Sequence, residues 1–255
     1  MDLNFLFVNA LNGVVYGAFL LLTSLGLSLV FGLGRVVNFA HGALFALGGY
    51  AIVTIMQKLG LNFWFALALA PLPVALLAIV IERVTIFPIR NRPEIYTLLV
   101  TFGMSFMLIG GAEHIWGTGT TLVRAPEGLR GTVQVFGNPY PAFRLVAAGL
   151  SLLFSASGFV LNLLPPLGLR TRPLTAEPRM AQPVVITPQW LLTLVFGGAA
   201  GLAALAGALS APIFAVHPEM GSGILLDSFL AVILGGLGNL PGTAIGALFV
   251  AMTKS

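Results

Sequence analysis

Apolar runs long enough to cross a bilayer alternate along the chain with short polar segments. A helix of about 20 apolar residues spans the hydrocarbon core of a membrane. The runs predict spans over roughly 7–31, 38–57, 62–84, 95–116, 143–164, 189–215 and 222–238. We therefore expect an all-α, polytopic transmembrane protein of about seven to eight spans, with residues 1–255 forming a single domain.

An eighth apolar run begins near Pro241 and stops at Met252, where Thr-Lys-Ser follows. Twelve residues make roughly 18 Å of helix at about 1.5 Å per residue, which is too short to cross the membrane. We expect either that this helix is not a full span or that the chain is cut short. The opening residues, MDLNFLF, lack the basic region of a signal peptide, so we expect them to begin the first span.

Arginine placement predicts the side of the membrane on which each loop lies, because Lys and Arg in short loops concentrate in the cytoplasm. One cluster follows the third span and another follows the fifth: Arg83, Arg90 and Arg92, then Arg170, Arg172 and Arg179. Two spans separate these clusters, so both lie on one side, together with Arg35. We expect this side to be cytoplasmic. The N-terminus and the loop 117–142, with Arg124, Glu127 and Arg130, are then outside.

Composition supports the membrane assignment and excludes several other classes. Hydrophobic residues make up 58% and charged residues only 8% of the chain, whereas a soluble domain is about 25% charged. The net charge of +4 comes without a basic run or a basic stripe rich in aromatic residues, so no nucleic-acid partner is expected. Cysteine is absent, and His41, His114 and His217 lack metal-ligand spacing, so we expect no metal and no other cofactor.

Fourteen residues near the start have a gapless counterpart near the end. GLGRVVNFAHGALF at 32–45 aligns with GLGNLPGTAIGALF at 236–249, and eight of the fourteen positions are identical. In a chain rich in Gly, Ala and Leu, duplication and chance both remain open. Corresponding Gly- or Pro-interrupted segments in two halves of a transporter point to its translocation path. The span count gives the two copies the same orientation.

The first copy of this repeat contains polar side chains in a run that otherwise suits hydrocarbon. Arg35 is expected at the cytoplasmic end, while Asn38 and His41, three residues apart, share a face if this segment is helical. Polar groups at membrane depth usually face a cavity or the protein interior. One interpretation is a polar lining or hinge of a path. The other, which we favour, is that both side chains bond to nearby backbone and stabilise a break in the helix.

Glycine pairs fall within or beside the predicted spans, at 48–49, 110–111, 197–198 and 235–236. Small residues let membrane helices approach closely, and this is the simpler interpretation of each pair. The other interpretation is a broken helix beside a substrate path.

Four stretches together resemble one family of membrane proteins. RVVNFAHGALFALGGY follows the first span, ERVTIFPIRNRP closes the third, LLVTFGMS opens the fourth and FLAVILGGLGNLPGTAIGAL lies near the end. Over about 10–250 the chain is similar to the permeases of branched-chain amino acid ABC importers, and to the H-type subunit more than the M-type. The resemblance implies a multi-pass protein of the bacterial inner membrane that works beside a second permease subunit. It also implies two cytoplasmic ATP-binding subunits and a periplasmic substrate-binding protein.

The resemblance, together with the polar and glycine positions above, indicates residues of a translocation path or hinge. They are Asn38, His41, Gly42, Gly48, Thr101, Asp227, Gly235, Gly236 and Gly238. ATP hydrolysis would belong to the partner subunits, so we do not expect an enzyme, and the chain has no GxxxxGK[ST] phosphate loop. Asp227 and Glu219 would bind the amino group of a substrate or dock the binding protein, or else be solvated charges.

The cytoplasmic loop at about 165–188 resembles the segment that couples such permeases to their ATPases. The resemblance rests on Gly168, Arg172, Glu177, Met180 and Ala181. It departs from the family at Pro173, Pro178, Pro183 and Val185. Proline inside a helix costs about 3 kcal/mol but little at the first helical position. A short helix over 178–182 remains compatible with the sequence.

Three alternatives to a branched-chain amino acid permease stay open. The same architecture could carry urea or short amides, because cargo choice in such importers belongs mostly to the binding protein. An ion-coupled secondary transporter would use Glu113, His114 and Asp227, although Glu113 and His114 also fit side chains that reach the interface beside Trp116. Since family members usually continue through another span, a truncated, non-transporting permease is the third.

Overall fold

In the computed structural model, which describes residues 3–163 and 188–254, helices account for nearly all of the regular structure. They are α1 (Leu3–Gly34), α2 (His41–Leu59), α3 (Phe63–Leu69), α4 (Pro71–Ile81), the π-helical η1 (Glu82–Ile86), α5 (Phe87–Ile89), α6 (Glu94–Trp116), α7 (Ala142–Leu163), α9 (Pro188–Ser210), α10 (Met220–Gly235) and α11 (Leu240–Lys254). Six helical stretches in the described part of the chain are long and apolar enough to cross a membrane, the joined run Phe63–Ile89 among them. The predicted all-α polytopic fold is confirmed.

The last two helices are shorter than the others. α10 has 16 residues and α11 has 15, which correspond to roughly 24 and 22 Å at about 1.5 Å per residue. The run predicted as a span over 222–238 therefore ends earlier, since Gly236 and Gly238 adopt φ values of 89° and 78° and turn the chain. Both are shorter than the six stretches of spanning length.

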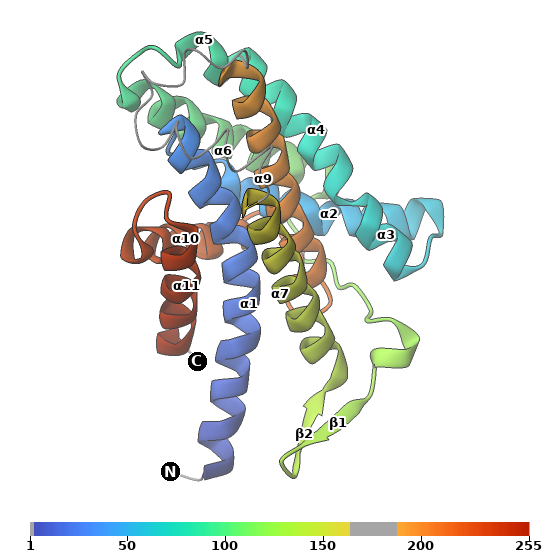
Figure 1. Cartoon of the computed structure of the whole chain (residues 1–255). Helices are drawn as coiled ribbons and strands as arrows, with labels where there is room; N and C mark the ends of the chain where they lie inside the picture. Colours follow the sequence, from blue (N-terminus) through green and yellow to red (C-terminus); the bar gives the residue numbers. More distant parts are fainter. Residues whose placement is uncertain (1–2, 164–187, 255) are drawn as a thin grey trace.

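The two ends of the molecule hold the loops that the arginine distribution separates. In Figure 1 the end of α1, α5 and the start of α9 lie at the top, while the N-terminus and the β-hairpin lie at the bottom. Contacts agree with this arrangement, because Thr193 of α9 donates to Glu82 of η1 at one end. At the other end Asn138 of the hairpin donates to Asn4 of α1. Arg35 and Arg83 thus lie opposite the loop 117–142, as predicted.

α1 is the central helix of the bundle and α6 lies at its edge. In α1, 78% of the most apolar stretch of the helix is buried inside the protein, whereas in α6 only 17% of the corresponding stretch is buried. α1 packs against α7, α9, α10 and α11 (Figure 1). α2 packs against α9 so closely that a Cβ atom on Gly48 would lie 2.0 Å from the carbonyl oxygen of Ala204. Gly48 therefore serves close helix packing.

The loop 117–142 contains a β-hairpin that the sequence analysis did not predict. η2 (Glu127–Leu129), a 3₁₀ turn, precedes β1 (Thr132–Val135) and β2 (Asn138–Pro141). Phe136 and Gly137 join the strands with positive φ values of 47° and 83°, as a two-residue hairpin turn of the primed type requires. The hairpin extends the end of the molecule at which α1 begins.

Candidate functional site

The segment 35–40 between α1 and α2 is not helical. It reverses the chain at Arg35, which has a φ of 50°. The side-chain oxygen of Asn38 accepts a hydrogen bond of 3.1 Å from the backbone N–H of Ala40, and α2 begins at His41. Asn38 therefore does not share a helical face with His41. Its side chain holds the turn that precedes the helix.

His41 and Thr101 fix this turn to two other helices. The Nε2 atom of His41 lies 3.0 Å from the carbonyl oxygen of Thr23 in α1. The hydroxyl of Thr101 in α6 donates to the carbonyl oxygen of Val37, 2.9 Å away. Asn38, His41 and Thr101 are each at most 2% exposed. The structure therefore brings three of the predicted residues together, with their side chains bonded to backbone groups.

The second copy of the repeat forms a similar reversal, the turn 236–239, before α11. This turn touches the last turn of α1, because a Cβ atom on Gly32 would lie 2.9 Å from the Cα of Gly238. α11 then runs antiparallel to α1, with Thr243 bonded to Ser28 and Ala251 against Gly17.

Gly42 and Gly235 occupy tight helix contacts like that of Gly48. A Cβ atom on Gly42 would lie 2.5 Å from the carbonyl oxygen of Gly221 in α10, and one on Gly235 would lie 2.2 Å from the backbone of Gly242 in α11. Close packing thus explains both positions. Among the predicted glycines, Gly236 and Gly238 differ from these because they shape a turn.

Asp227 lies in the middle of α10 and is 2% exposed. Both of its carboxylate oxygens accept hydrogen bonds of 2.7 Å from the ammonium group of Lys254 in α11. The hydroxyl of Tyr16 in α1 also donates to this carboxylate. Three helices thus converge on one buried charge, whose counter-ion is part of the chain. The side chain is not a solvated charge at the start of a span.

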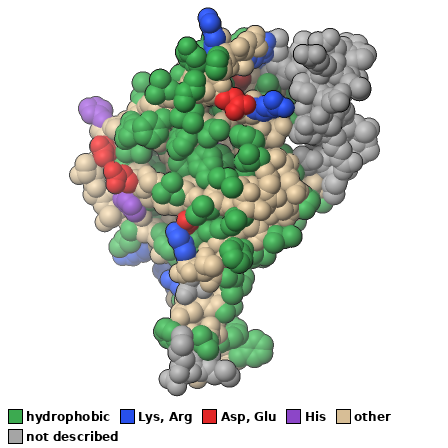
Figure 2. Space-filling model, turned by 90° about the vertical axis from the view of Figure 1, so that its left-hand side faces the viewer, with side chains coloured by type: hydrophobic (Ala, Val, Ile, Leu, Met, Phe, Trp, Pro, Cys, Tyr) green, Lys and Arg blue, Asp and Glu red, His purple; other side chains and the backbone are tan. Residues whose placement is uncertain are grey.

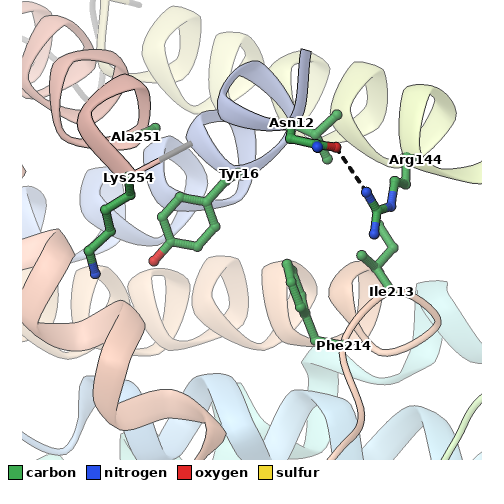
Figure 3. A pocket seen from close by; sticks show the side chains of 8 residues that line it. Asn12, Tyr16, Arg144, Ile213, Phe214, Ala251 and Lys254 are labelled. Carbon is green, nitrogen blue, oxygen red and sulfur yellow. Dashed lines mark hydrogen bonds between the residues drawn. The ribbon is translucent and has the colours of Figure 1, made fainter. Parts of the chain in front are cut away.

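A cavity of about 330 Å³ opens beside this cluster, between α1, α7, α11 and the segment that follows α9 (Figure 3). Its apolar lining comes from Val15, Ile213, Phe214 and Ala251, and the ring of Tyr16 contributes as well. Arg144 faces it from the first turn of α7, where its Nη1 atom donates to the side-chain oxygen of Asn12, 2.9 Å away. The cavity is therefore mostly apolar, with Arg144 on one side and Lys254, which is paired with Asp227, on the other.

A second cavity of about 330 Å³ adjoins the first and shares Tyr16 and Phe214 with it. Ser210, His217 and Glu219 supply its polar groups. Glu219 is exposed, which agrees with a solvated charge at the outer surface.

Asn12, Tyr16, Arg144 and Lys254 were missed as site residues in the sequence analysis. Asn12 and Tyr16 are four apart in an otherwise apolar helix, so they share a face. That spacing is a signal the sequence does contain. For Arg144 and Lys254 no local pattern indicates a role, because each acts through a contact with a distant helix.

The other predicted residues lie away from the cavities. Asn38, His41 and Thr101 do not line either of them. Glu113 and His114 lie in the last turn of α6, where His114 is exposed. Gly168, Arg172, Glu177, Met180 and Ala181, with the possible helix 178–182, lie outside the described residues.

The outer surface fits a lipid environment. In Figure 2 hydrophobic side chains cover much of the face on the α10–α11 side of the molecule. Large apolar side chains that are more than 40% exposed include Leu226, Leu230 and Ile233 of α10 and Ile245, Leu248 and Phe249 of α11. With six helical stretches of spanning length, this surface defines a multi-pass membrane protein.

The interrupted helices, the buried charge and the cavities fit a membrane permease. The family described as branched-chain amino acid transport system / permease component matches residues 9–255. The chain belongs to this family. The family assignment from the four sequence stretches is thereby confirmed.

Curated relatives cover nearly the whole chain at low identity. The permease protein LivH of a high-affinity branched-chain amino acid transport system in Salmonella typhimurium is 25% identical, over 96% of this chain and 83% of its own length. BraD of Pseudomonas aeruginosa, named for the same kind of system, is 26% identical over the same shares. A probable LivH of Methanocaldococcus jannaschii is 24% identical over 95% of this chain and 78% of its own length. No solved structure matches the chain significantly.

Proposed function

We propose that this chain is one permease subunit of an ATP-driven importer of branched-chain amino acids in the cytoplasmic membrane. The observation on which the proposal rests is the family match over 9–255, together with relatives named for branched-chain amino acid transport. A second permease subunit, two cytoplasmic ATP-binding subunits and an external substrate-binding protein complete the system. ATP hydrolysis belongs to the partners.

The path follows the side of α1 on which α10 and α11 pack. The two adjoining cavities lie toward the end that holds the hairpin, since Tyr140 of β2 and Arg144 both bond to Asn12. A substrate released outside therefore meets these cavities first. In transporters, sites commonly form where broken helices meet. The turns 35–40 and 236–239 supply such breaks further along the path.

The turns act as the hinge when the path changes its opening from one side to the other. Asn38, His41 and Thr101 hold the first turn through bonds to backbone groups, while Gly236 and Gly238 shape the second. Gly42, Gly48 and Gly235 set the close packing of the helices that move together. Asp227 ties α10 to α1 and α11.

Coupling to the ATPases runs through the loop at about 165–188. Gly168, Arg172, Glu177, Met180 and Ala181 would contact the ATP-binding subunit there. α9 follows this loop, and Thr193 donates to the buried Glu82 of η1. π-helical segments frequently occur at functional sites. A displacement of α9 is thus transmitted directly to η1.

The test is uptake by proteoliposomes containing the chain with its co-purifying subunits, with the binding protein outside and ATP inside. We expect leucine to accumulate only with ATP and to compete with isoleucine and valine. Uptake of urea or short amides in place of leucine would show that the cargo is wrong while the importer architecture still holds. Uptake that persists without ATP and stops with a proton ionophore would contradict the proposal. Failure of the chain to assemble with an ATP-binding subunit would favour a non-transporting permease.

A further inference from the structure

We infer that Arg144 and the cavity beside it form a subsite for the carboxylate group of a short aliphatic substrate. This inference rests on the proposed function and adds to it the atoms that recognise the cargo. The site lies between α1, α7, α11 and the segment after α9, and Figure 3 shows Arg144 and Tyr16 among the side chains that line it.

The guanidinium group of Arg144 is held in place but keeps free donors. Its Nη1 atom donates to the side-chain oxygen of Asn12, and the hydroxyl of Tyr140 donates to the same oxygen at 2.7 Å. These two donors occupy both lone pairs of that oxygen. A guanidinium group has about five N–H donors, so most of them remain for a ligand.

No acid neutralises Arg144 within the described residues. Among the ion pairs found there, Asp227 pairs with Lys254. The other two pairs are Arg83 with Glu82 and Arg130 with Glu127. The residues lining this cavity include no Asp or Glu. Since a buried or half-buried cation favours an anionic partner, and planar carboxylates fit the guanidinium fork, a carboxylate is the group the site accepts.

The rest of the cavity fits a small branched apolar group. Val15, Ile213, Phe214 and Ala251 line it, and side chains of this kind bind aliphatic groups by removing them from water. Its volume of about 330 Å³ lies at the lower end of the range of roughly 300–1,000 Å³ for small-molecule sites. One amino acid therefore suits it better than a peptide or a lipid.

The test uses leucine and two analogues that each lack one of its charged groups. Isocaproate keeps the carboxylate and lacks the ammonium group, whereas isoamylamine has the reverse. Binding of radiolabelled leucine to the purified chain with its co-purifying subunits is measured in nanodiscs without the binding protein. We expect isocaproate to displace leucine and isoamylamine not to do so.

Variants then assign this preference to Arg144. Arg144→Gln is expected to weaken binding of leucine and isocaproate about tenfold or more, because a charge-assisted hydrogen bond is lost. Arg144→Lys should retain part of the affinity. Arg130→Gln is the matched control, because Arg130 lies in the loop at the same end of the molecule and pairs with Glu127 at 3.6 Å. It should leave binding unchanged.

Several outcomes would overturn the subsite. They are displacement by isoamylamine instead of isocaproate, absence of any carboxylate binding at millimolar concentration, and unchanged leucine affinity in a correctly folded Arg144→Gln variant. If Arg144→Gln leaves the leucine affinity unchanged but loses co-purified anionic lipid, the guanidinium group binds a lipid phosphate instead. The analogue series needs no variant, so misfolding of Arg144→Gln does not affect it. Arg144-dependent binding of isocaproate without binding or uptake of leucine would keep the subsite and contradict the proposed cargo.

Discussion

Lys254 of α11 and Asp227 of α10 form an ion pair in which both carboxylate oxygens lie 2.7 Å from the ammonium nitrogen. The two side chains differ in environment, since Asp227 is 3% exposed and Lys254 is 54% exposed. The pair therefore compensates a buried negative charge with a partly exposed cation that also lines the cavity.

Removing Lys254 should destabilise the protein more than removing both members of the pair. Lys254→Met leaves the carboxylate of Asp227 buried without a counter-ion, and we expect a loss of about 1–3 kcal/mol, discounted for the partial exposure of the lysine. Thermal unfolding in detergent measures this. The double variant Asp227→Asn, Lys254→Met should recover part of the loss.

Lys58→Met provides the control for this series, because Lys58 is an exposed lysine in the last turn of α2. Its substitution should leave the unfolding temperature unchanged. A double variant as unstable as Lys254→Met alone would show that the pair contributes nothing through its charges.

His41→Leu should impair transport while the protein still reaches the membrane. The substitution removes the contact between the ring and the carbonyl oxygen of Thr23, which ties the start of α2 to α1. We expect the uptake rate to fall several-fold, which corresponds to a loss of about 1 kcal/mol of coupling free energy between the two helices. His114→Leu, at an exposed position on α6, is the control. Normal uptake by the His41 variant would refute the hinge role.

Gly238→Ala should weaken both stability and uptake. Gly238 has a φ of 78°, where a side chain costs about 1–2 kcal/mol, and its added Cβ would lie 2.9 Å from the Cα of Gly32. Gly110→Ala is the matched control, because a Cβ there meets nothing within 4 Å. Equal stability of the two variants, measured by thermal unfolding, would contradict the tight turn.

The predicted sidedness can be tested by labelling single cysteines, since the chain has no cysteine of its own. Arg124→Cys in the outer loop should react with a membrane-impermeant maleimide in intact cells. Arg92→Cys, just before α6, should react only after the membrane is permeabilised. Both positions are exposed, so accessibility within the fold does not differ. The reverse pattern would invert the topology.

The spanning helices could be predicted from the sequence because hydropathy depends on local composition. The predicted span 95–116 and α6 (Glu94–Trp116) differ by one residue at the start. The hairpin was not predicted, because strands of four residues give little periodic signal. The predicted span 222–238 extended past the end of α10 for a related reason. Gly236 and Gly238 turn the chain through positive φ values, and this leaves no mark in the hydropathy of the sequence.

The candidate site was less predictable than the fold. Asn38 and His41 were recognised from polarity alone, and their bonds to backbone groups agree with the favoured interpretation of a helix break. Asp227 was recognised, but its partners lie 211 and 27 residues away along the chain. Contacts of this kind depend on helix packing, which one sequence does not specify locally.

The contact between Gly32 and Gly238 joins the last turn of α1 to the turn 236–239 at their backbones. With no side chain between them, the turn 236–239 cannot shift without displacing the end of α1. Because the end of α1 leads directly into the segment 35–40 before α2, this one contact links the start of α2 to the start of α11. A pull on either helix reaches the other within the same subunit, before any partner has moved.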